Sequence, residues 1–244
     1  MYGQSRALLL GEIFGGTACS YDEIVAVATG GSDAQWKSEL LDHVGSPERV
    51  LDLACGTGIL TFMMRDRFPE AEIVGVDRSI EYLSAARERA RARGDGRSRF
   101  VLGDAETAEV PGRFDAIVSC YLPKYADLPA LDSRLRTSLA PGGRVVLQDF
   151  VYPEHPAVQR GWERRFDLLR RRVADEWPEA RRMFELLPGV IRESRWIQEI
   201  PALFVALGLE EVRVIRQSCG ISALVTALRP QDPSSSRTRS LRGR

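Results

Sequence analysis

The stretch Arg49-Val-Leu-Asp-Leu-Ala-Cys-Gly-Thr-Gly58 decides the fold, because an apolar run leads directly into a glycine-rich turn. Its first part, residues 49–54, has the aliphatic composition of a strand that is buried on both faces. Gly56 and Gly58 lack a Cβ, so the backbone can turn tightly there and its amides can approach a ligand at the carboxyl end of the strand. The stretch therefore predicts a strand, a ligand-binding turn and a helix in succession.

Outward from this stretch, short β-rich runs alternate with amphipathic helical stretches, which is typical of a parallel sheet covered by helices. The predicted strands are residues 49–54, 72–77, 99–103, 114–121, 144–150, 211–216 and 221–228. Helices are predicted at residues 79–93, after a serine cap, and at residues 128–139, before a Pro-Gly-Gly stop. A short connection joins the last two strands, so this pair is predicted to be antiparallel.

These patterns predict an α/β fold: a Rossmann-like, seven-stranded, mostly parallel sheet with an antiparallel last strand and helices on both faces. Residues 1–228 are predicted to form one domain, with a ligand-binding core at residues 49–152. A helical lid is predicted after the fifth strand, at residues 153–199, with an apolar face of Trp162, Phe166, Leu169 and Val173. Residues 229–244 are predicted to be a disordered basic tail, because they hold little apolar surface to bury.

The sequence carries 34 basic and 34 acidic side chains, so its formal net charge is zero at pH 7. This zero is the sum of +4 at residues 229–244 and −4 over the remainder. Because there is no global basic field, we expect no nucleic-acid partner. The four cysteines are widely spaced, with no CxxC pair, so we expect no metal site and a reducing, cytoplasmic setting. No apolar run reaches the roughly 18 residues of a membrane span.

The cofactor class follows from the residues around the glycine turn. Asp77 lies 19 residues beyond Gly58, at the end of the second predicted strand, where a carboxylate can accept hydrogen bonds from both ribose hydroxyls. A dinucleotide site has a third glycine or alanine, whereas this sequence has Thr61. Asp52 precedes the turn, where its charge would repel a pyrophosphate and attract a sulfonium or an ammonium. The sequence therefore favours S-adenosyl-L-methionine over a nicotinamide cofactor.

At five places the sequence resembles the successive motifs of the class I S-adenosylmethionine-dependent methyltransferases. These motifs are Asp52-Leu-Ala-Cys-Gly-Thr-Gly58, Gly75-Val-Asp-Arg-Ser79, Gly103-Asp-Ala-Glu106, Phe114-Asp-Ala-Ile117 and Leu139-Ala-Pro-Gly-Gly-Arg-Val-Val146. Within this class the chain resembles the ubiquinone/menaquinone biosynthesis C-methyltransferase family. That narrower resemblance lies in Tyr21-Asp22, Trp36-Lys37 and Gly220-Ile-Ser-Ala223, and the whole resemblance covers roughly residues 14–228.

The resemblance implies which residues bind the cofactor. Tyr21 and Lys37 would flank its methionine end, Asp77 would hold the ribose, and Asp104 with Ala105 would contact the adenine. The full set implied for the cofactor is Tyr21, Lys37, Asp52, Ala54, Cys55, Gly56, Gly58, Asp77, Arg78, Asp104, Ala105, Ser119 and Cys120.

Candidates for catalysis are fewer, because methyl transfer from a sulfonium depends mainly on alignment and on excluding water. A phenolic ring carbon becomes nucleophilic when a neighbouring hydroxyl is deprotonated or hydrogen-bonded. His155, after the fifth strand, is the candidate base, since an imidazole titrates near physiological pH; a solvated loop histidine is the alternative. Tyr21 and Tyr121 are candidate hydroxyl donors, as are Tyr125 and Tyr152.

The predicted function is C-methylation of a quinol or phenolic ring, with a small-molecule methyl acceptor and no integral membrane segment. One alternative is a secondary-metabolite O- or C-methyltransferase, because the quinone family usually has Gly-Leu-Arg-Asn where this chain has Leu122-Pro-Lys-Tyr125. An alternative of another class is a catalytically silent, cofactor-binding partner subunit. A homodimer, and peripheral membrane contact through the Arg-rich lid or the tail, are further hypotheses.

Overall fold

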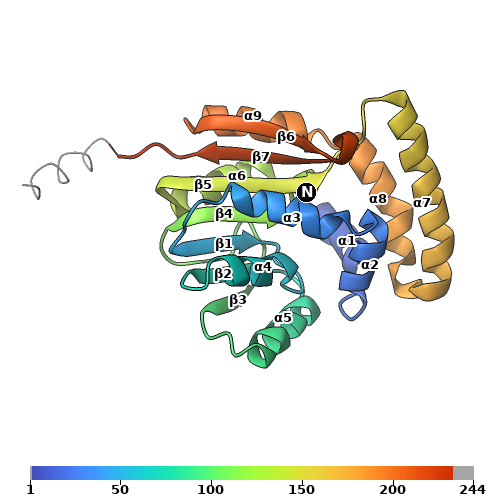
Figure 1. The fold of residues 1–244 in the computed structure, drawn as a ribbon, viewed down its shortest axis with the longest axis horizontal. Coiled ribbons are helices and arrows are strands. Elements are labelled where there is room, and N and C mark those ends of the chain that lie inside the picture. Colours follow the sequence, from blue (N-terminus) through green and yellow to red (C-terminus); the bar gives the residue numbers. More distant parts are fainter. Residues whose placement is uncertain (1, 233–244) are drawn as a thin grey trace, which may run out of the picture.

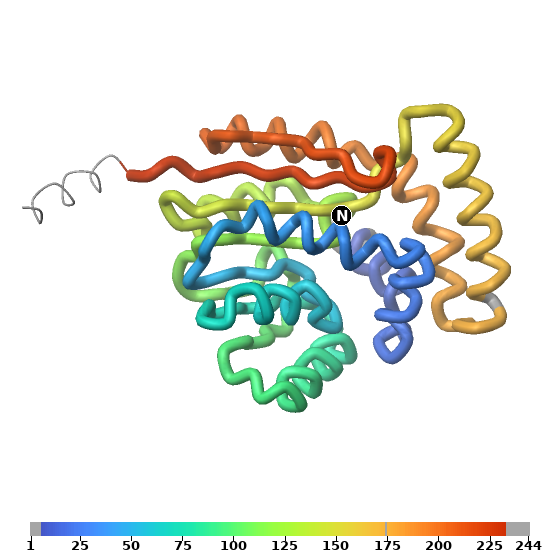
Figure 2. Tube along the Cα trace, viewed as in Figure 1, coloured from blue at the N-terminus to red at the C-terminus, as the bar shows by residue number. Residues whose placement is uncertain are grey.

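A seven-stranded sheet forms the centre of the protein (Figures 1 and 2). The computed structural model describes residues 2–232, with side chains from residue 6 onward except that of Ala174. The strand order is β3-β2-β1-β4-β5-β7-β6. The strands are β1 Arg49–Leu53, β2 Glu72–Asp77, β3 Ser98–Leu102, β4 Phe114–Cys120, β5 Leu139–Phe150, β6 Glu210–Gln217 and β7 Ser222–Leu228.

The predicted fold class is confirmed. β1 to β5 pair in parallel, whereas β7 pairs antiparallel with both β5 and β6. β5 begins at Leu139 rather than at the predicted Arg144, because Leu139 already pairs with Phe114 across an irregularity in the register. All parallel strands therefore end at the same edge of the sheet as the glycine turn that follows β1.

Alternate residues of the central strands enter two separate apolar cores, as expected for strands buried on both faces. Leu51 and Leu53 pack with α6 and α9 on one face, whereas Val50 packs with α3 and α4 on the other. Ser79 caps the start of α5, as predicted, by accepting a hydrogen bond from the Tyr82 amide at 3.2 Å. These helices are α3 Ser32–Asp42, α4 Ile59–Arg67, α5 Ile80–Ala92, α6 Leu128–Ser138 and α9 Trp196–Ala206.

Four further helices gather beyond the carboxyl ends of the parallel strands (Figure 1). They are α1 Tyr2–Phe14, α2 Tyr21–Thr29, α7 Pro156–Glu176 and α8 Arg181–Glu193, with short 3₁₀ turns at η1 Pro123–Tyr125, η2 Pro178–Ala180 and η3 Ser218–Gly220. The four helices share a third apolar core, in which Trp162, Phe166 and Leu169 of α7 are buried with Phe184 of α8. The apolar face expected on α7 is therefore packed inside the protein.

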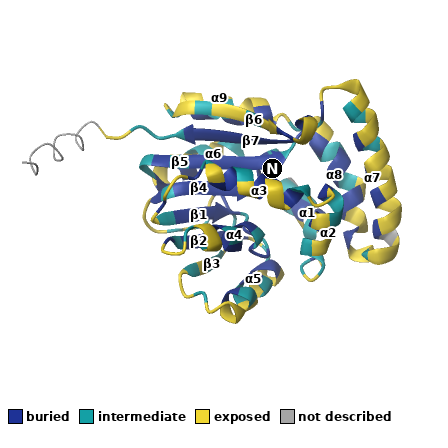
Figure 3. Ribbon diagram, viewed as in Figure 1, coloured by how far each residue is buried: buried dark blue, intermediate teal, exposed yellow. Residues whose placement is uncertain are grey.

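The outer face of α7 is exposed (Figure 3) and carries Arg164, Arg165, Arg170, Arg171 and Arg172. Two of these arginines form ion pairs on α7, Arg170 with Asp167 and Arg172 with Glu176, and Glu163 of α7 pairs with Arg192 of α8. These contacts are typical of a solvated face with salt bridges. Within residues 2–232, no helix has the length and apolar character needed to cross a membrane.

The chain beyond β7 stays close to the sheet for a few residues. The Arg229 amide donates to the Gly143 carbonyl at 2.8 Å, and the Gly142 amide donates to the Arg229 carbonyl at 2.9 Å. The segment predicted as a tail therefore starts with ordered backbone contacts. Residues 233–244, which make up the rest of that segment, lie outside the described residues.

Candidate active site

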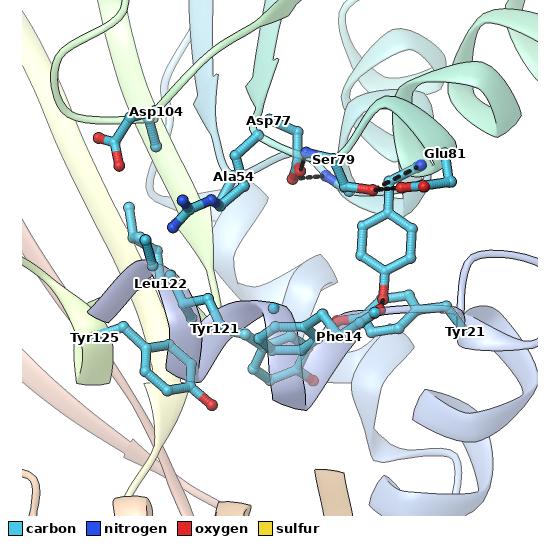
Figure 4. Close-up of a pocket in the computed structure, with 18 of the residues that line it drawn as sticks. Phe14, Tyr21, Ala54, Asp77, Ser79, Glu81, Asp104, Tyr121, Leu122 and Tyr125 are labelled. Carbon is cyan, nitrogen blue, oxygen red and sulfur yellow. Dashed lines mark hydrogen bonds between the residues drawn. The ribbon is translucent and has the colours of Figure 1, made fainter. Parts of the chain in front are cut away.

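A cavity of about 320 Å³ lies where the carboxyl ends of β1, β2 and β4 meet α1 and α2 (Figure 4). It is lined by Arg6, Ala7, Leu10, Gly11, Phe14, Gly15, Tyr21, Ala54, Gly56, Asp77, Arg78, Ser79, Glu81, Tyr82, Asp104, Ala105, Cys120, Tyr121, Leu122 and Tyr125. Two smaller cavities share residues with it: one of about 30 Å³ beside Lys37 and Asp52, and an apolar one of about 40 Å³ toward α7 and α8. Tyr21 and Tyr121 line all three, so they mark the junction.

The glycine turn and Asp77 are joined by hydrogen bonds. The Asp77 carboxylate accepts from the Gly56 amide at 2.8 Å on one oxygen and from the Ser79 amide at 2.9 Å on the other. Burial raises the pKa of Asp77, and these two amide bonds oppose that shift. Because each carboxylate oxygen has two lone pairs, each can accept one further hydrogen bond. Asp77 is thus positioned and still able to bind two hydroxyl groups.

The geometry of the turn explains its residue types. Ala54 follows β1 with a φ of 58°, in the left-handed region that non-glycine residues rarely adopt. Gly58 has a φ of 87°, and a Cβ at this position would lie 2.6 Å from the ring of Phe62. A larger residue at position 58 would therefore force the turn away from α4.

Asp52 lies beneath the turn with almost no exposed surface. Its carboxylate accepts a hydrogen bond from the Thr61 hydroxyl at 2.6 Å. Burial raises the pKa of Asp52 from 3.8 to about 7, against the opposing effects of the Thr61 hydroxyl and Lys37. Thr61 stands where a dinucleotide site has glycine or alanine, and its hydroxyl serves here to hold this carboxylate.

Lys37, Asp33 and Tyr121 form a buried polar cluster beside Asp52. The Lys37 ammonium and the Asp33 carboxylate make an ion pair within α3. The Tyr121 hydroxyl donates to the same Asp33 oxygen at 2.5 Å, and the Lys37 ammonium lies 4.7 Å from the centre of the Tyr121 ring. Tyr121 itself has a φ of 69° and stacks on Phe150 with ring centres 5.0 Å apart. Its side chain is therefore fixed from three directions at the junction of the cavities.

A second buried ion pair also contacts Tyr121. The Lys124 ammonium, 1% exposed, binds the fully buried Asp149 carboxylate at 2.8 Å and the Tyr121 carbonyl at 2.9 Å. Burial lowers the pKa of Lys124 and raises that of Asp149, and the attraction within the pair opposes both shifts. Next to it, the Tyr125 hydroxyl is buried and has no hydrogen-bond partner within the part of the chain that the structure describes. Sequence reasoning missed this pair.

The end of the cavity near β3 is closed by charged residues. Asp104 accepts a hydrogen bond from the Glu106 amide at 2.9 Å and keeps a partly exposed carboxylate. Arg6 of α1 forms an ion pair with the buried Glu106 and lies 3.7 Å from the Asp104 carboxylate. Ala105 also lines the cavity here. Helix α1 is therefore attached to the loop that follows β3.

Helix α1 forms one wall of the large cavity, with Arg6, Leu10 and Phe14 among its lining residues. It packs against α8 and is connected to α5 through the Tyr82 hydroxyl, which donates to the carbonyl of Phe14, the last residue of α1, at 3.4 Å. Sequence reasoning assigned no role to this helix. The one available signal was the short apolar run at residues 7–10, which the structure places partly in this wall.

Most of the residues proposed for the cofactor come together around these cavities. Those that line them are Tyr21, Lys37, Asp52, Ala54, Cys55, Gly56, Asp77, Arg78, Asp104, Ala105 and Cys120. Ser119 is not among the lining residues, because it is fully buried and its hydroxyl donates to the Leu53 carbonyl at 2.5 Å. Gly58 acts through the shape of the turn, as the N-cap of α4.

The catalytic candidates divide in the same way. Tyr21 and Tyr121 lie at the junction of the cavities, and Tyr125 lines the large one. His155 lies outside these cavities: it is exposed at the start of α7, where its Nδ1 accepts a hydrogen bond from the Ala157 amide at 3.2 Å. His155 is therefore the N-cap of α7. The Tyr152 hydroxyl also lies outside the cavities and donates a hydrogen bond to the Glu163 carboxylate at 3.1 Å.

The residues present fit S-adenosyl-L-methionine. Asp77 keeps free lone pairs where a ribose would lie, and the small cavity offers both the Asp52 carboxylate and the Lys37 ammonium to an amino-acid group. The fold and these residues define a class I S-adenosylmethionine-dependent methyltransferase. The chain belongs to this family, because residues 45–193 match the family model described as "Methyltransferase domain".

The chain is also similar to individual methyltransferases in sequence or fold. Demethylmenaquinone methyltransferase from Thermus thermophilus is 37% identical over 145 residues, 58% of this chain and 66% of the relative, so the match spans about two thirds of that protein. Ubiquinone/menaquinone biosynthesis C-methyltransferase from Dinoroseobacter shibae is 27% identical over 228 residues, 90% of each chain. The crystal structure of a putative S-adenosylmethionine-dependent methyltransferase from Methanococcus maripaludis has a TM-score of 0.62 at 16% identity, covering 88% of this chain and 92% of that one. This last likeness shows the fold alone.

Proposed function

We propose that this protein methylates a ring carbon of a quinol-type acceptor, with S-adenosyl-L-methionine as the methyl donor. One observation carries the proposal: Tyr21 and Tyr121 line the large cavity, the charged small cavity and the apolar cavity. The cofactor residues and an aromatic wall therefore share one junction, as a flat apolar acceptor requires. The similarity to demethylmenaquinone methyltransferase supports the same acceptor class.

Bound S-adenosylmethionine would supply an electrophilic methyl group on a positively charged sulfur. The chain's own residues would hold it, with Asp77 on the ribose, and with Asp52 and Lys37 at the methionine end. Because Asp52 is buried, its ionised form is screened little by water, so a nearby cation and the Asp52 negative charge would stabilise each other more strongly than at an exposed carboxylate. Helix α1 and the aromatic side chains would keep water away from the reacting groups.

The two junction tyrosines act as hydrogen-bond donors in this proposal. Burial raises the pKa of Tyr21 and of Tyr121 well above 10, so both hydroxyls stay protonated at neutral pH. A protonated hydroxyl can stabilise a phenolate oxygen on the acceptor but cannot remove a proton from it. We propose that the ring hydroxyl is activated by hydrogen bonding to protein donors. The base role first suggested for His155 is not carried forward, since this side chain lies outside the cavities.

The test is an acceptor screen with isotopically labelled methyl donor. Reduced demethylnaphthoquinones, simple phenols and small carboxylic acids are incubated with the protein, and products are identified by mass spectrometry and NMR. We expect label on a ring carbon of the quinols. Label only on oxygen, or only on other acceptors, would contradict the proposed acceptor while leaving the methyltransferase class intact.

A second candidate is the tailoring of a secondary metabolite on carbon or oxygen. Its support is the η1 turn, where Lys124 and Tyr125 stand in place of the Arg-Asn of the quinone family. Since Leu122 and Tyr125 line the cavity, this change alters the wall that an acceptor would touch. Cofactor binding without methyl transfer to any acceptor would instead support the silent partner subunit. Peripheral membrane contact and a homodimer stay hypotheses.

A further inference from the structure

The chain has only two lysines, Lys37 and Lys124, although it is rich in arginine. Both lysines are buried, both are paired with a carboxylate, and both ammonium groups lie within 5.4 Å of the centre of the Tyr121 ring. An ammonium is a compact charge, whereas a guanidinium is a wide planar fork. At both positions the protein therefore buries a positive charge on a compact head group rather than on a wide guanidinium.

The two lysines serve different cavities. Lys37 lines the small charged cavity with Asp52, where the methionine end of the cofactor is placed. Lys124 lines the apolar cavity, whose other walls are Phe14, Tyr21, Ile24, Val25, Ala28, Thr29, Tyr121, Phe150, Phe166, Met183, Phe184 and Leu187. Lys124 is the one charged residue among the described residues of this lining. A charge in such a setting is costly unless a ligand or a partner compensates for it.

The hydrogen bonds of Lys124 leave one donor available. An ammonium has three N–H donors, and among the described residues the Lys124 ammonium has two acceptors, the Asp149 carboxylate and the Tyr121 carbonyl. The ring of Tyr125, which lines the adjoining large cavity, has its centre 4.5 Å from the ammonium nitrogen, and its buried hydroxyl has no hydrogen-bond partner among the described residues. Each of the two adjoining cavities thus has one incompletely satisfied polar group, which favours a ligand that brings an oxygen to this region.

We propose that the apolar cavity receives the oxygen-bearing edge of the methyl acceptor, and that the third N–H of Lys124 donates to an acidic oxygen on that edge. The proposal rests on the proposed function and narrows its acceptor to flat apolar rings with a phenolic or enolic oxygen. The 40 Å³ cavity is smaller than a ring, so the remainder of the acceptor lies in the large cavity, which shares Phe14, Tyr21 and Tyr121 with it. Lys124 is then a specificity-determining residue.

The test compares two probes that differ only at one oxygen. 2-Hydroxy-1,4-naphthoquinone is an acid that ionises readily, and 2-methoxy-1,4-naphthoquinone is its neutral methyl ether. Affinities are measured calorimetrically with the full chain saturated with S-adenosylhomocysteine. A hydrogen bond between charged groups contributes about 1.5–3 kcal/mol, so we expect the hydroxy probe to bind roughly tenfold or more tightly than the ether.

Variants test whether Lys124 causes the preference for the hydroxy probe. In Lys124→Met the two affinities should fall within about twofold of each other, because the ammonium donor is lost. Removing one partner of a buried ion pair can impair folding, so Lys124→Met/Asp149→Asn, which removes both charges, is measured alongside. The matched control is Arg172→Met on the exposed face of α7, which should keep the full preference.

Selective labelling provides an independent readout. With ¹³Cε-lysine the chain gives two lysine signals, which Lys124→Met or the double variant assigns. The hydroxy probe should shift the Lys124 signal, whereas the ether should shift it less. The proposal is overturned if the hydroxy probe does not bind, if wild type binds both probes equally, or if the double variant keeps the preference. If Lys124 governs probe binding but no quinol is methylated, the proposed function fails while the proposed role of Lys124 stands. If quinols are methylated but Lys124 has no effect on probe binding, the proposed function stands and the role of Lys124 fails.

Discussion

Lys37 and Asp33 form a buried ion pair one helical turn apart on α3, and the Tyr121 hydroxyl donates to the same Asp33 carboxylate. This carboxylate therefore connects α3 to the end of β4. Because Tyr121 lines all three cavities, the ion pair fixes the position of a side chain that both cofactor and acceptor would contact. A helix on one face of the sheet thereby positions a side chain at the junction of the three cavities.

Asp33→Asn should destabilise the protein by about 3–5 kcal/mol, since it leaves the Lys37 charge buried without its partner. The free energy of unfolding, measured by urea denaturation, tests this value. Asp33→Asn/Lys37→Met removes both charges and should recover much of the loss. Equal losses in the single and double variants would show that the ion pair is not the cause.

Asp77→Ala should weaken binding of S-adenosylhomocysteine by about 1.5–3 kcal/mol, the usual contribution of hydrogen bonds to a charged group. The reason is the loss of the two lone pairs that the Gly56 and Ser79 amides leave available. Calorimetric titration gives the affinity, and circular dichroism checks that the turn variant is folded. Asp132→Ala, at an exposed pair on α6, is the control and should bind normally. An unchanged affinity in Asp77→Ala would remove this residue from the ribose role.

The stability of the cofactor-free protein should fall as the pH rises from about 4 to 7, because of Asp52. Its pKa is about 7 in the folded state and 3.8 in the unfolded reference, so the folded state binds an extra proton in this interval. Each pKa unit corresponds to about 1.4 kcal/mol, which makes the full effect on the order of 4 kcal/mol. Denaturation at several pH values measures the slope, and Asp52→Asn should reduce it, leaving the part that comes from other buried carboxyls such as Asp77 and Asp149. An unchanged slope in Asp52→Asn would exclude Asp52 as a cause.

Arg6→Gln should accelerate dissociation of S-adenosylhomocysteine roughly tenfold, taking the lower end of the range for a charged hydrogen bond. Arg6 attaches α1 to the buried Glu106 at the cavity wall, so its loss should loosen the helix over the cofactor. Stopped-flow fluorescence measures the rate. The control is Arg182→Gln on α8, which breaks an exposed ion pair with Glu12 of α1. This variant should leave the dissociation rate nearly unchanged. Equal acceleration in both variants would contradict a specific role for Arg6.

The sequence predicted the sheet and the cofactor turn because both depend on local patterns. Short apolar runs and the Gly56 turn need no distant information, and Asp77 follows at a fixed distance along the chain. Lys124 and Asp149 are 25 residues apart, and they meet because β4 and β5 run parallel with Cys120 opposite Gln148. That register places the residues after β4 beside the end of β5, so their pairing required the fold first.

Two other features were harder to predict from the sequence. The ion pair between Asp33 and Lys37 had a signal in its spacing of four residues, which is common among exposed pairs as well as buried ones. Helix α1 had almost none, because Gly11 interrupts its short apolar run and its partners lie far along the chain. The placement of His155 depended on whether its loop turned toward the cavity, and α7 begins there instead.

The packing of α1 against α8 joins two helices that are about 170 residues apart in the sequence, as in the contact between Glu12 and Arg182. A ribosome delivers the N-terminal segment first, yet the surface on which α1 rests becomes available only after the residues of α8 have emerged. The large cavity thus acquires its α1 wall only once the residues of α8 have been synthesised. A chain truncated before α8 would lack the surface that supports this wall, so we expect it to exchange a bound methyl donor more readily.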